Sequence, residues 1–210
     1  IADGHHRSAS ACKVGLRRRE EHPDYTGDEE FNFFMAVIFP DSDLRIFDYN
    51  RVVKDLNGLD EAQFIAAVRQ AGFDIEAKDG QYRPEAGHTF GMYLGGCWYK
   101  LTAKPNSFDP ADPVGVLDVS ILQRNLLAPL LAIKDPRTDK RIHFVGGIRG
   151  MKELERLVNS GRYAVAFSLY PTSIQELMAI ADAGEIMPPK STWFEPKLRD
   201  AMAIHLIGDR

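Results

Sequence analysis

The stretch TFGMYLGGCWYKL, residues 89–101, predicts a β-hairpin. Its two halves, Thr89–Leu94 and Trp98–Leu101, are apolar or alternate in polarity, and Gly95-Gly96 between them suits a tight turn. A further short strand is expected over Phe73–Ala77. The aromatic side chains here are typical of cross-strand packing rather than of a platform for stacked bases. The hairpin therefore indicates that a sheet is the framework of the fold.

Helical patterns precede and follow this hairpin in the sequence. A helix from Asp60 keeps apolar residues at helical spacing and ends at Gly72, and Asp118 is expected to cap a leucine-rich, well-buried helix. This mixture predicts an α+β fold in which mixed sheets are covered by packed helices. The remaining elements expected in the second half are strands over 142–145 and 163–169 and helices over 151–158 and 173–183.

Three other segments give weaker expectations. The apolar run Phe33–Phe39 predicts a central strand that forms a hairpin with Leu44–Phe47 across a turn at Pro40. A last strand is expected over Ala203–Ile207. The segment 187–197 contains three prolines, which predicts a loop without regular pairing.

A polar stretch rich in Pro, Asp, Asn and Ser, residues 104–113, is the best candidate for an internal boundary. It divides the chain into an α/β lobe over 1–104 and another over 105–210, which we expect to form one compact unit. The sequence begins at Ile1, in what resembles the end of a strand that leads into a loop. We therefore expect a fragment of a longer protein, with part of any active site upstream.

Composition and charge exclude several classes of protein. The 210 residues are 44% hydrophobic and 27% charged with a net charge of −4, so the chain has no positive field for extended nucleic-acid binding. No apolar run is long enough to cross a membrane, and no signal peptide is recognisable. Cys12 and Cys97 match no metal or redox spacing, which favours a reduced, cytoplasmic setting with both residues buried as small hydrophobes.

The opening segment Asp3-Gly4-His5-His6-Arg7-Ser8 is the strongest candidate for a phosphate site. A helix is expected over 7–19, so Gly4 and the first N–H groups of that helix would approach the anion, together with Arg7 and Ser8. His5 and His6 are candidate catalytic groups for proton transfer. The alternative is an ordinary Asp-Gly turn with solvated basic side chains.

Two later segments carry further candidates. Lys190, Ser191, Thr192 and Lys197 offer ammonium and hydroxyl donors that could bind phosphate oxygens, although the segment lacks P-loop spacing and could equally be a proline-stiffened connector. Asn50 and Arg51 place an amide beside a guanidinium, which could bind a carboxylate or phosphate of a substrate, with a cap or turn as the alternative.

The chain has no strong metal signature. No spacing of His, Cys, Asp or Glu is typical of a zinc site, so a magnesium ion carried by a nucleotide is the more plausible metal. Asp3 is the candidate ligand for it.

Four ordered motifs resemble the bacterial and archaeal "DUF ten-fifteen" family of unknown function. The resemblance spans nearly the whole chain, and members of that family are about twice as long, so it implies that this sequence is their C-terminal half. The motifs are Asp3-Gly4-His5-His6-Arg7, Asp48-Tyr49-Asn50-Arg51, Leu117-Asp118-Val119-Ser120-Ile121-Leu122 and the run MPPKSTWFEPK over 187–197.

The opening motif is also similar to the phosphate-binding box of the ParB and sulfiredoxin superfamily, in which a Gly, a polar residue and an Arg stand at a helix start. An archaeal free-serine kinase of that superfamily carries a version that Asp3, Gly4, His5 and Arg7 match, whereas His6 replaces Thr. The resemblance implies a ParB/sulfiredoxin-like box at the N-terminus of the first helix.

These observations predict a phosphotransferase that moves a phosphoryl group between a nucleotide, ATP or ADP with Mg²⁺, and a small hydroxylated metabolite. Serine is the metabolite that the resemblance implies. Such an enzyme depends on positioning and charge neutralisation, and we expect Arg7 and Lys190 to approach one concave pocket. A nucleotide-binding regulator without turnover and a structural or interaction module remain alternatives, and homodimerisation and the direction of transfer stay open.

Overall fold

The computed structural model describes residues 3–197, 199 and 202–208, and it divides the chain into two compact units. The first unit comprises Ile1–Arg45 with Phe194–Arg210, and the second comprises Ile46–Trp193. The expected boundary at 104–113 lies within the second unit.

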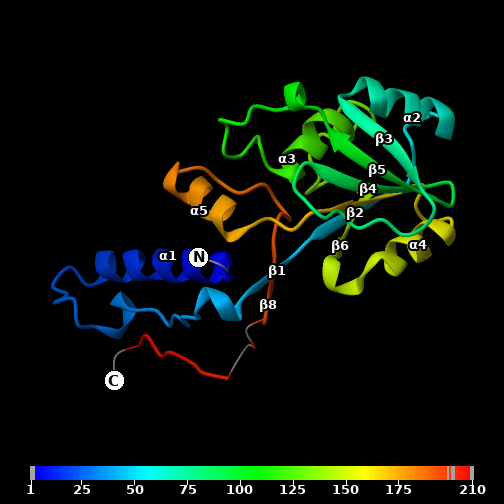
Figure 1. Ribbon diagram of the computed structural model, residues 1–210. Coiled ribbons are helices and arrows are strands. Elements are labelled where there is room, and N and C mark those ends of the chain that lie inside the picture. The colour runs from blue at the N-terminus through cyan, green and yellow to red at the C-terminus, as the bar shows by residue number, and fades with distance from the viewer. Residues whose placement is uncertain (1–2, 198, 200–201, 209–210) are drawn as a thin grey trace. The chain divides into compact units, whose positions relative to one another are not determined.

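A six-stranded sheet forms the centre of the second unit, in the order β3-β5-β4-β7-β2-β6 (Figure 1). Neighbouring strands in it run antiparallel. The expected hairpin is confirmed, because Leu94 pairs with Cys97 across the two turn glycines. The strands are β2 (Tyr49–Val53), β3 (Phe73–Lys78), β4 (Thr89–Leu94), β5 (Cys97–Ala103), β6 (Ile142–Gly146) and β7 (Val165–Leu169).

Helices cover both faces of this sheet, which confirms the α+β class (Figure 1). Helices α2 (Glu61–Gln70) and α3 (Asp118–Leu122) contribute to the larger core on one face, and α4 (Met151–Asn159) packs on the other. Successive strand residues alternate between the two cores. Val52, for example, belongs to the α4 side and Val53 to the α2 and α3 side, as the period of two in a strand requires.

The helix starts follow from local sequence. The carboxylate of Asp60 accepts a hydrogen bond from the Gln63 N–H at 2.8 Å, and the Gln63 side chain bonds back to Asp60 N at 3.0 Å, which completes a capping box for α2. Helix α5 (Ile174–Asp182) begins with the same arrangement between Ser173 and Glu176. Both helices are expected from the sequence and are confirmed.

The leucine-rich helix differs in one respect from the prediction. Its N-cap is Leu117, and Asp118 is the first helical residue rather than the cap. The helix continues as a π-helical turn over Gln123–Leu127, and its leucines are buried as expected. The side chain of Asp118 is instead directed to the backbone N–H of His88, on another loop.

The first unit contains α1 (His5–Glu21), which is longer than the predicted helix at both ends. Its expected apolar face is not packed, since Val14 and Leu16 are 40% and 54% exposed and Gly15 is the one buried residue of the helix. A Cβ on Gly15 would lie 2.9 Å from the Phe31 carbonyl oxygen. The absence of a side chain there lets the segment after the helix pack closely against it.

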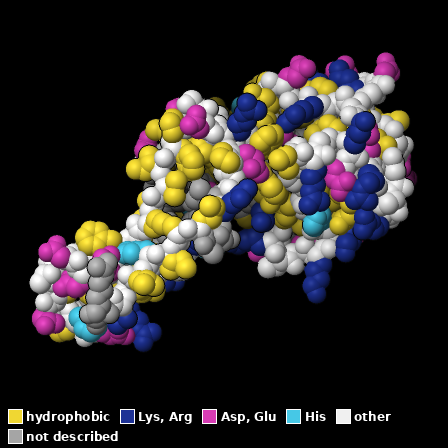
Figure 2. Space-filling model, turned by 90° about the horizontal axis from the view of Figure 1, so that it is seen from below, with side chains coloured by type: hydrophobic (Ala, Val, Ile, Leu, Met, Phe, Trp, Pro, Cys, Tyr) yellow, Lys and Arg dark blue, Asp and Glu magenta, His cyan; other side chains and the backbone are white. Residues whose placement is uncertain are grey.

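The predicted strand over 33–39 is wrong: the segment has no regular structure, and Ile38 in it is 93% exposed. Exposed hydrophobic side chains also occur elsewhere in the described chain, and Figure 2 shows hydrophobic side chains among charged ones on one face. The predicted strand over 203–207 is likewise absent. Short strands β1 (Arg45–Phe47) and β8 (Trp193–Glu195) pair with each other instead.

Strand β8 also corrects the prediction that the proline-rich segment forms no regular pairs. Its prolines stand at positions outside Trp193–Glu195, so these three residues keep their backbone donors. Both cysteines are exposed rather than buried. Within the described ranges, none of the helices has the length and apolar character needed to span a membrane.

Candidate functional site

The N-terminus of α1 is formed by the opening motif. Gly4 precedes the helix with φ 81° and ψ 25°, a left-handed conformation that glycine adopts without strain, and no side chain caps the helix. No acidic residue stands in the first turn, whereas His5, His6 and Arg7 do, and all three are exposed. Basic residues at the positive end of a helix dipole are unfavourable, so a bound anion would stabilise this arrangement.

Asp3 and Lys197 lie together beside this helix start. Asp3 Oδ1 accepts a hydrogen bond from the Gly4 N–H at 2.8 Å, and Lys197 Nζ lies 3.3 Å from Asp3 Oδ2. Partial burial acts to raise the pKa of Asp3, but the Gly4 N–H, Lys197 and Arg7 outweigh it and lower the pKa below its ordinary value. The carboxylate therefore stays ionised. Asp3 and Lys197 are 194 positions apart in the sequence, and their contact places the C-terminal segment beside the start of α1.

Ser8 lies in the first turn, where its N–H bonds to Gly4 O at 2.9 Å as part of the helix. In the first unit the structure thus brings together Asp3, Gly4, Arg7, Ser8 and Lys197 from the predicted residues.

The remaining predicted residues belong to the second unit. Arg51 on β2 is 3% exposed, and its guanidinium donates to the carbonyl oxygens of Tyr49 and, at 3.2 Å, of Lys190. It also lies 5.5 Å from the centre of the Phe144 ring. Burial lowers the pKa of Arg51 to about 10, so the side chain remains charged near neutral pH.

The Lys190 segment is tied to the sheet by this contact. Lys190 has φ 58°, and its ammonium lies 5.6 Å from the centre of the Tyr49 ring. Ser191 is buried and donates to Pro188 O at 2.6 Å, and Thr192 is partly buried. That Arg7 and Lys190 share one pocket stays a prediction.

Asn50 is fully buried, and its side chain connects neighbouring parts of the sheet by hydrogen bonds. Its Nδ2 donates to Asp48 Oδ2 at 2.5 Å and its Oδ1 accepts from the Leu169 N–H at 3.0 Å. Asp48 is also fully buried, and Arg83 Nη2 lies 2.8 Å from its Oδ1. This network links β2 to β7 and to the loop that contains Arg83. The amide of Asn50 is committed to structural partners.

A buried carboxyl that the sequence did not single out as a site is Asp118. Its Oδ1 accepts from the His88 N–H at 2.7 Å, and within the described part of the chain Oδ2 has no hydrogen bond of normal geometry. Burial, with a smaller contribution from the Glu176 carboxylate, raises the pKa of Asp118 to about 7, against the lowering effects of the His88 and Tyr170 N–H groups and of Arg51. Its position at the start of a leucine-rich helix was the available signal.

The described residues contain no cluster of three or more His, Cys, Asp or Glu side chains that could hold a metal ion. Asp3 is one carboxylate beside the candidate phosphate site. A magnesium ion there would take most of its ligands from phosphate oxygens and water, a pattern that is usual for nucleotide-bound Mg²⁺.

The fold and these geometries define an α+β protein with an antiparallel sheet and an uncapped, basic helix start. The sequence matches the family described as "Protein of unknown function (DUF1015)" over residues 1–120, and the chain belongs to that family. A search of curated proteins gave no significant match.

The solved structures that are similar to this chain include the following three. A free serine kinase variant in complex with AMP is 12% identical, with a TM-score of 0.47. The matched region covers 75% of this chain and 57% of the kinase chain. A conserved hypothetical protein from Pyrococcus furiosus is 18% identical with a TM-score of 0.46, covering 92% and 68%. SbnI from Staphylococcus aureus is 14% identical with a TM-score of 0.43, covering 75% and 52%. The chain thus spans a little over half the length of the serine kinase structure.

Proposed function

We propose that this chain provides the phosphate-binding part of a phosphotransferase that moves a phosphoryl group between a nucleotide and a small hydroxylated metabolite, with serine as the first metabolite to test. The observation that carries the proposal is the start of α1. Its N–H groups have no side-chain cap, its first turn holds basic and no acidic residues, and Lys197 joins it from the far end of the sequence. Phosphate oxygens are the groups that such an arrangement binds best.

Each residue of the box has a role in the proposal. Gly4 allows the phosphate to approach the backbone, Arg7 and Ser8 donate to its oxygens, and Lys197 adds a second charge. His5 and His6 are the candidates for proton transfer, because an imidazole ring can both donate and accept a proton. Asp3 holds Lys197 in place and is the candidate ligand for nucleotide-bound Mg²⁺, which would neutralise phosphate charge.

The second-unit residues support binding in a different way. Lys190, Ser191 and Thr192 are proposed as further phosphate-binding candidates within the second unit, where Arg51 fixes their segment through the Lys190 carbonyl oxygen. Asn50 acts indirectly, since its amide holds Asp48 and β7.

The test measures nucleotide affinity by titration calorimetry with the whole chain and with Arg7→Ala. Loss of a charged hydrogen bond of about 1.5–3 kcal/mol predicts a decrease in affinity of roughly 10- to 100-fold. Lys13→Ala is the matched control, because it removes one exposed positive charge from the same helix. Equal affinities for the two variants, or no binding of ATP or ADP at all, would refute the phosphate box.

Turnover is measured separately by phosphorus NMR, with serine and labelled nucleotide as substrates. Phosphoserine formation that Arg7→Ala abolishes supports the phosphotransferase. Saturable nucleotide binding without any product, in a protein that includes the family's full length, supports the regulator instead.

A further inference from the structure

The second unit contains a cavity of about 590 Å³, and its lining includes Arg51, Val119 and Pro188, which belong to three different sequence motifs. It lies between α3 with its π-helical turn and two loops, residues 134–137 and 186–189. Its volume is in the range of pockets that bind small organic molecules. Six charged residues contribute to its lining: Arg51, Arg124, Lys134, Arg137, Asp112 and Asp135.

The charges of this cavity do not balance. Arg124 lies 3.8 Å from Asp112 and Arg137 lies 3.1 Å from Asp135, so the two carboxylates are matched by two of the four cations. Arg51 and Lys134 form no ion pair among the described residues, although the buried carboxyl of Asp118, which does not line the cavity, interacts electrostatically with Arg51. The cavity therefore carries an excess of two positive charges, in a chain whose net charge is −4.

Arg51 is the informative member of this set. It is 3% exposed, and its described hydrogen bonds go to two neutral carbonyl oxygens. A buried cation without a paired carboxylate is costly, and an oxyanion in the adjoining cavity would compensate for it. A guanidinium also matches the geometry of a carboxylate or phosphate by donating two parallel hydrogen bonds.

The rest of the lining is largely apolar. Val119 lies on the helix side, and Ile186, Met187, Pro188 and Pro189 lie on the loop side. Such a wall favours a ligand with a hydrocarbon or aromatic body over a bare inorganic ion.

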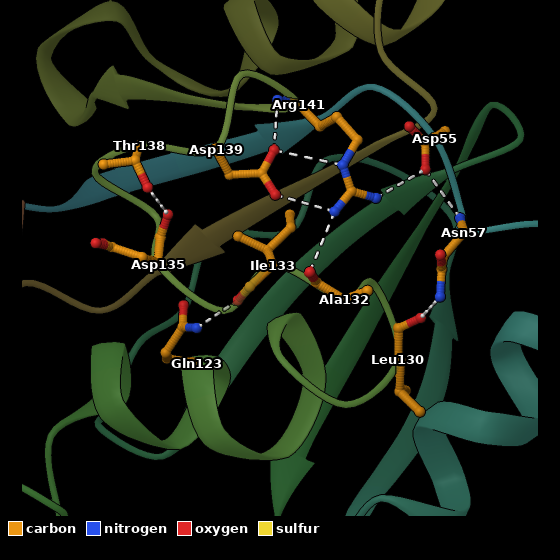
Figure 3. Close-up of polar contacts among 10 residues, drawn as sticks. All are labelled: Asp55, Asn57, Gln123, Leu130, Ala132, Ile133, Asp135, Thr138, Asp139 and Arg141. Atoms are coloured by element: carbon orange, nitrogen blue, oxygen red, sulfur yellow. Dashed lines mark hydrogen bonds and ion pairs between the residues drawn. The ribbon is translucent and has the colours of Figure 1, made fainter.

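The loop that contributes Lys134 is held in place by side chains (Figure 3). Gln123 Nε2 donates to Ile133 O at 2.7 Å, immediately before it. After it, Arg141 donates to Asp139 Oδ2 at 2.9 Å and to Ala132 O at 3.2 Å, and it reaches Asp55 at 3.4 Å. Because both ends of this loop are fixed, the side of the cavity that it forms is held in place without a ligand.

We propose that this cavity is a binding site for an organic dianion, a phosphate monoester or a dicarboxylate with an apolar body, in which Arg51 and Lys134 contact the charged groups. The site lies entirely within the second unit. It uses no residue of the α1 start and requires no phosphoryl transfer. Failure of the phosphate site at α1 would therefore not exclude binding in this cavity.

The test titrates the whole chain with phenyl phosphate and, in a second series, with phthalate. We expect saturable binding of at least one of them and binding about tenfold weaker for inorganic phosphate, because that ion has no apolar body. Tighter binding of phenyl phosphate identifies the phosphate class, and tighter binding of phthalate the dicarboxylate class. Equal binding of benzyl alcohol, which has the ring and no charge, would overturn the proposal.

Variants assign this binding to the cavity. Arg51→Met and the double variant Arg124→Gln/Lys134→Gln should each weaken it by about tenfold or more, while Arg69→Gln and Lys140→Gln, on the same unit and outside the cavity, should change it less than about twofold. The double variant alters the mouth of the cavity, so it remains decisive if Arg51→Met fails to fold.

Arg7→Ala separates this site from the box. Binding that survives Arg7→Ala and is lost in the double variant supports the cavity. Binding that is lost in Arg7→Ala and kept in the double variant belongs to the box and overturns the cavity site. No binding of either dianion also overturns it.

Discussion

Replacing Asp118 by Asn should stabilise the protein at alkaline pH and much less at acid pH. The side chain is buried, and its pKa rises from 3.8 to about 7 mainly because burial disfavours the charged form. One pKa unit corresponds to about 1.4 kcal/mol, so ionisation of Asp118 in the folded protein costs about 4 kcal/mol relative to the unfolded chain. Asn keeps an oxygen that can accept the His88 N–H and has no charge to bury.

The sign of the pH dependence follows from linkage. Between about pH 4 and 7 the folded state binds a proton at Asp118 that the unfolded state has lost, so the stability of the wild type falls as pH rises through this window and then levels off. The advantage of Asp118→Asn should therefore grow by about 2–3 kcal/mol between about pH 5 and pH 8.

The assay is urea denaturation of both proteins across this pH range, analysed by linear extrapolation. Asp79→Asn, on an exposed turn, is the matched control and should stay within about 0.5 kcal/mol of the wild type. A stability difference for Asp118→Asn that is constant with pH, or a variant that is less stable than the wild type at about pH 8, would refute the reasoning.

Two further substitutions test the packing that positions the candidate sites. Gly91→Ala places a Cβ 2.8 Å from a backbone carbonyl oxygen and 2.2 Å from a buried hydroxyl, so thermal denaturation should show a loss of about 1–3 kcal/mol, whereas Gly87→Ala, which meets no atom within 4 Å, should be nearly neutral. Asp48→Ala leaves a buried amide without its partner and should reduce the free energy of unfolding in urea by about 1–3 kcal/mol, and Arg83→Ala, which takes the paired cation away from a fully buried carboxylate, should also reduce it.

Elements whose signals are local could be predicted from the sequence. The capping box at Asp60 and the glycine turn of the β4-β5 hairpin both depend on residues a few positions apart, and the helix and the hairpin are present as expected. Helix α1 is predicted in the same way, although its apolar residues are exposed. A helical pattern is set by the backbone, whereas burial depends on what packs against it.

The errors concern partners that are distant in sequence. The run over 33–39 has the composition of a central strand, yet no described strand pairs with it, and the expected hairpin fails for that reason. Its supposed partner β1 pairs with β8, about 150 residues further along. Strand propensity shows that a segment can form a sheet, but it does not identify the neighbouring strand.

The same limitation explains which site residues the sequence revealed. The α1 box is contiguous, so its residues stand together as a motif in the sequence itself. The cavity combines Arg51 on β2, which the sequence offers with Asn50 as a candidate substrate-binding residue, with Arg124 beyond α3 and Lys134 on a loop, each of which alone is typical of an ordinary surface cation. The feature that marks the cavity as a candidate site is the burial of Arg51 without an ion pair among the described residues. This feature is a property of the folded chain and is not visible in the sequence. The guanidinium of Arg51 donates to two carbonyl oxygens and interacts with Asp118, but it forms no ion pair among the described residues, so an oxyanion bound in the cavity would supply a charge partner that the fold itself does not place there.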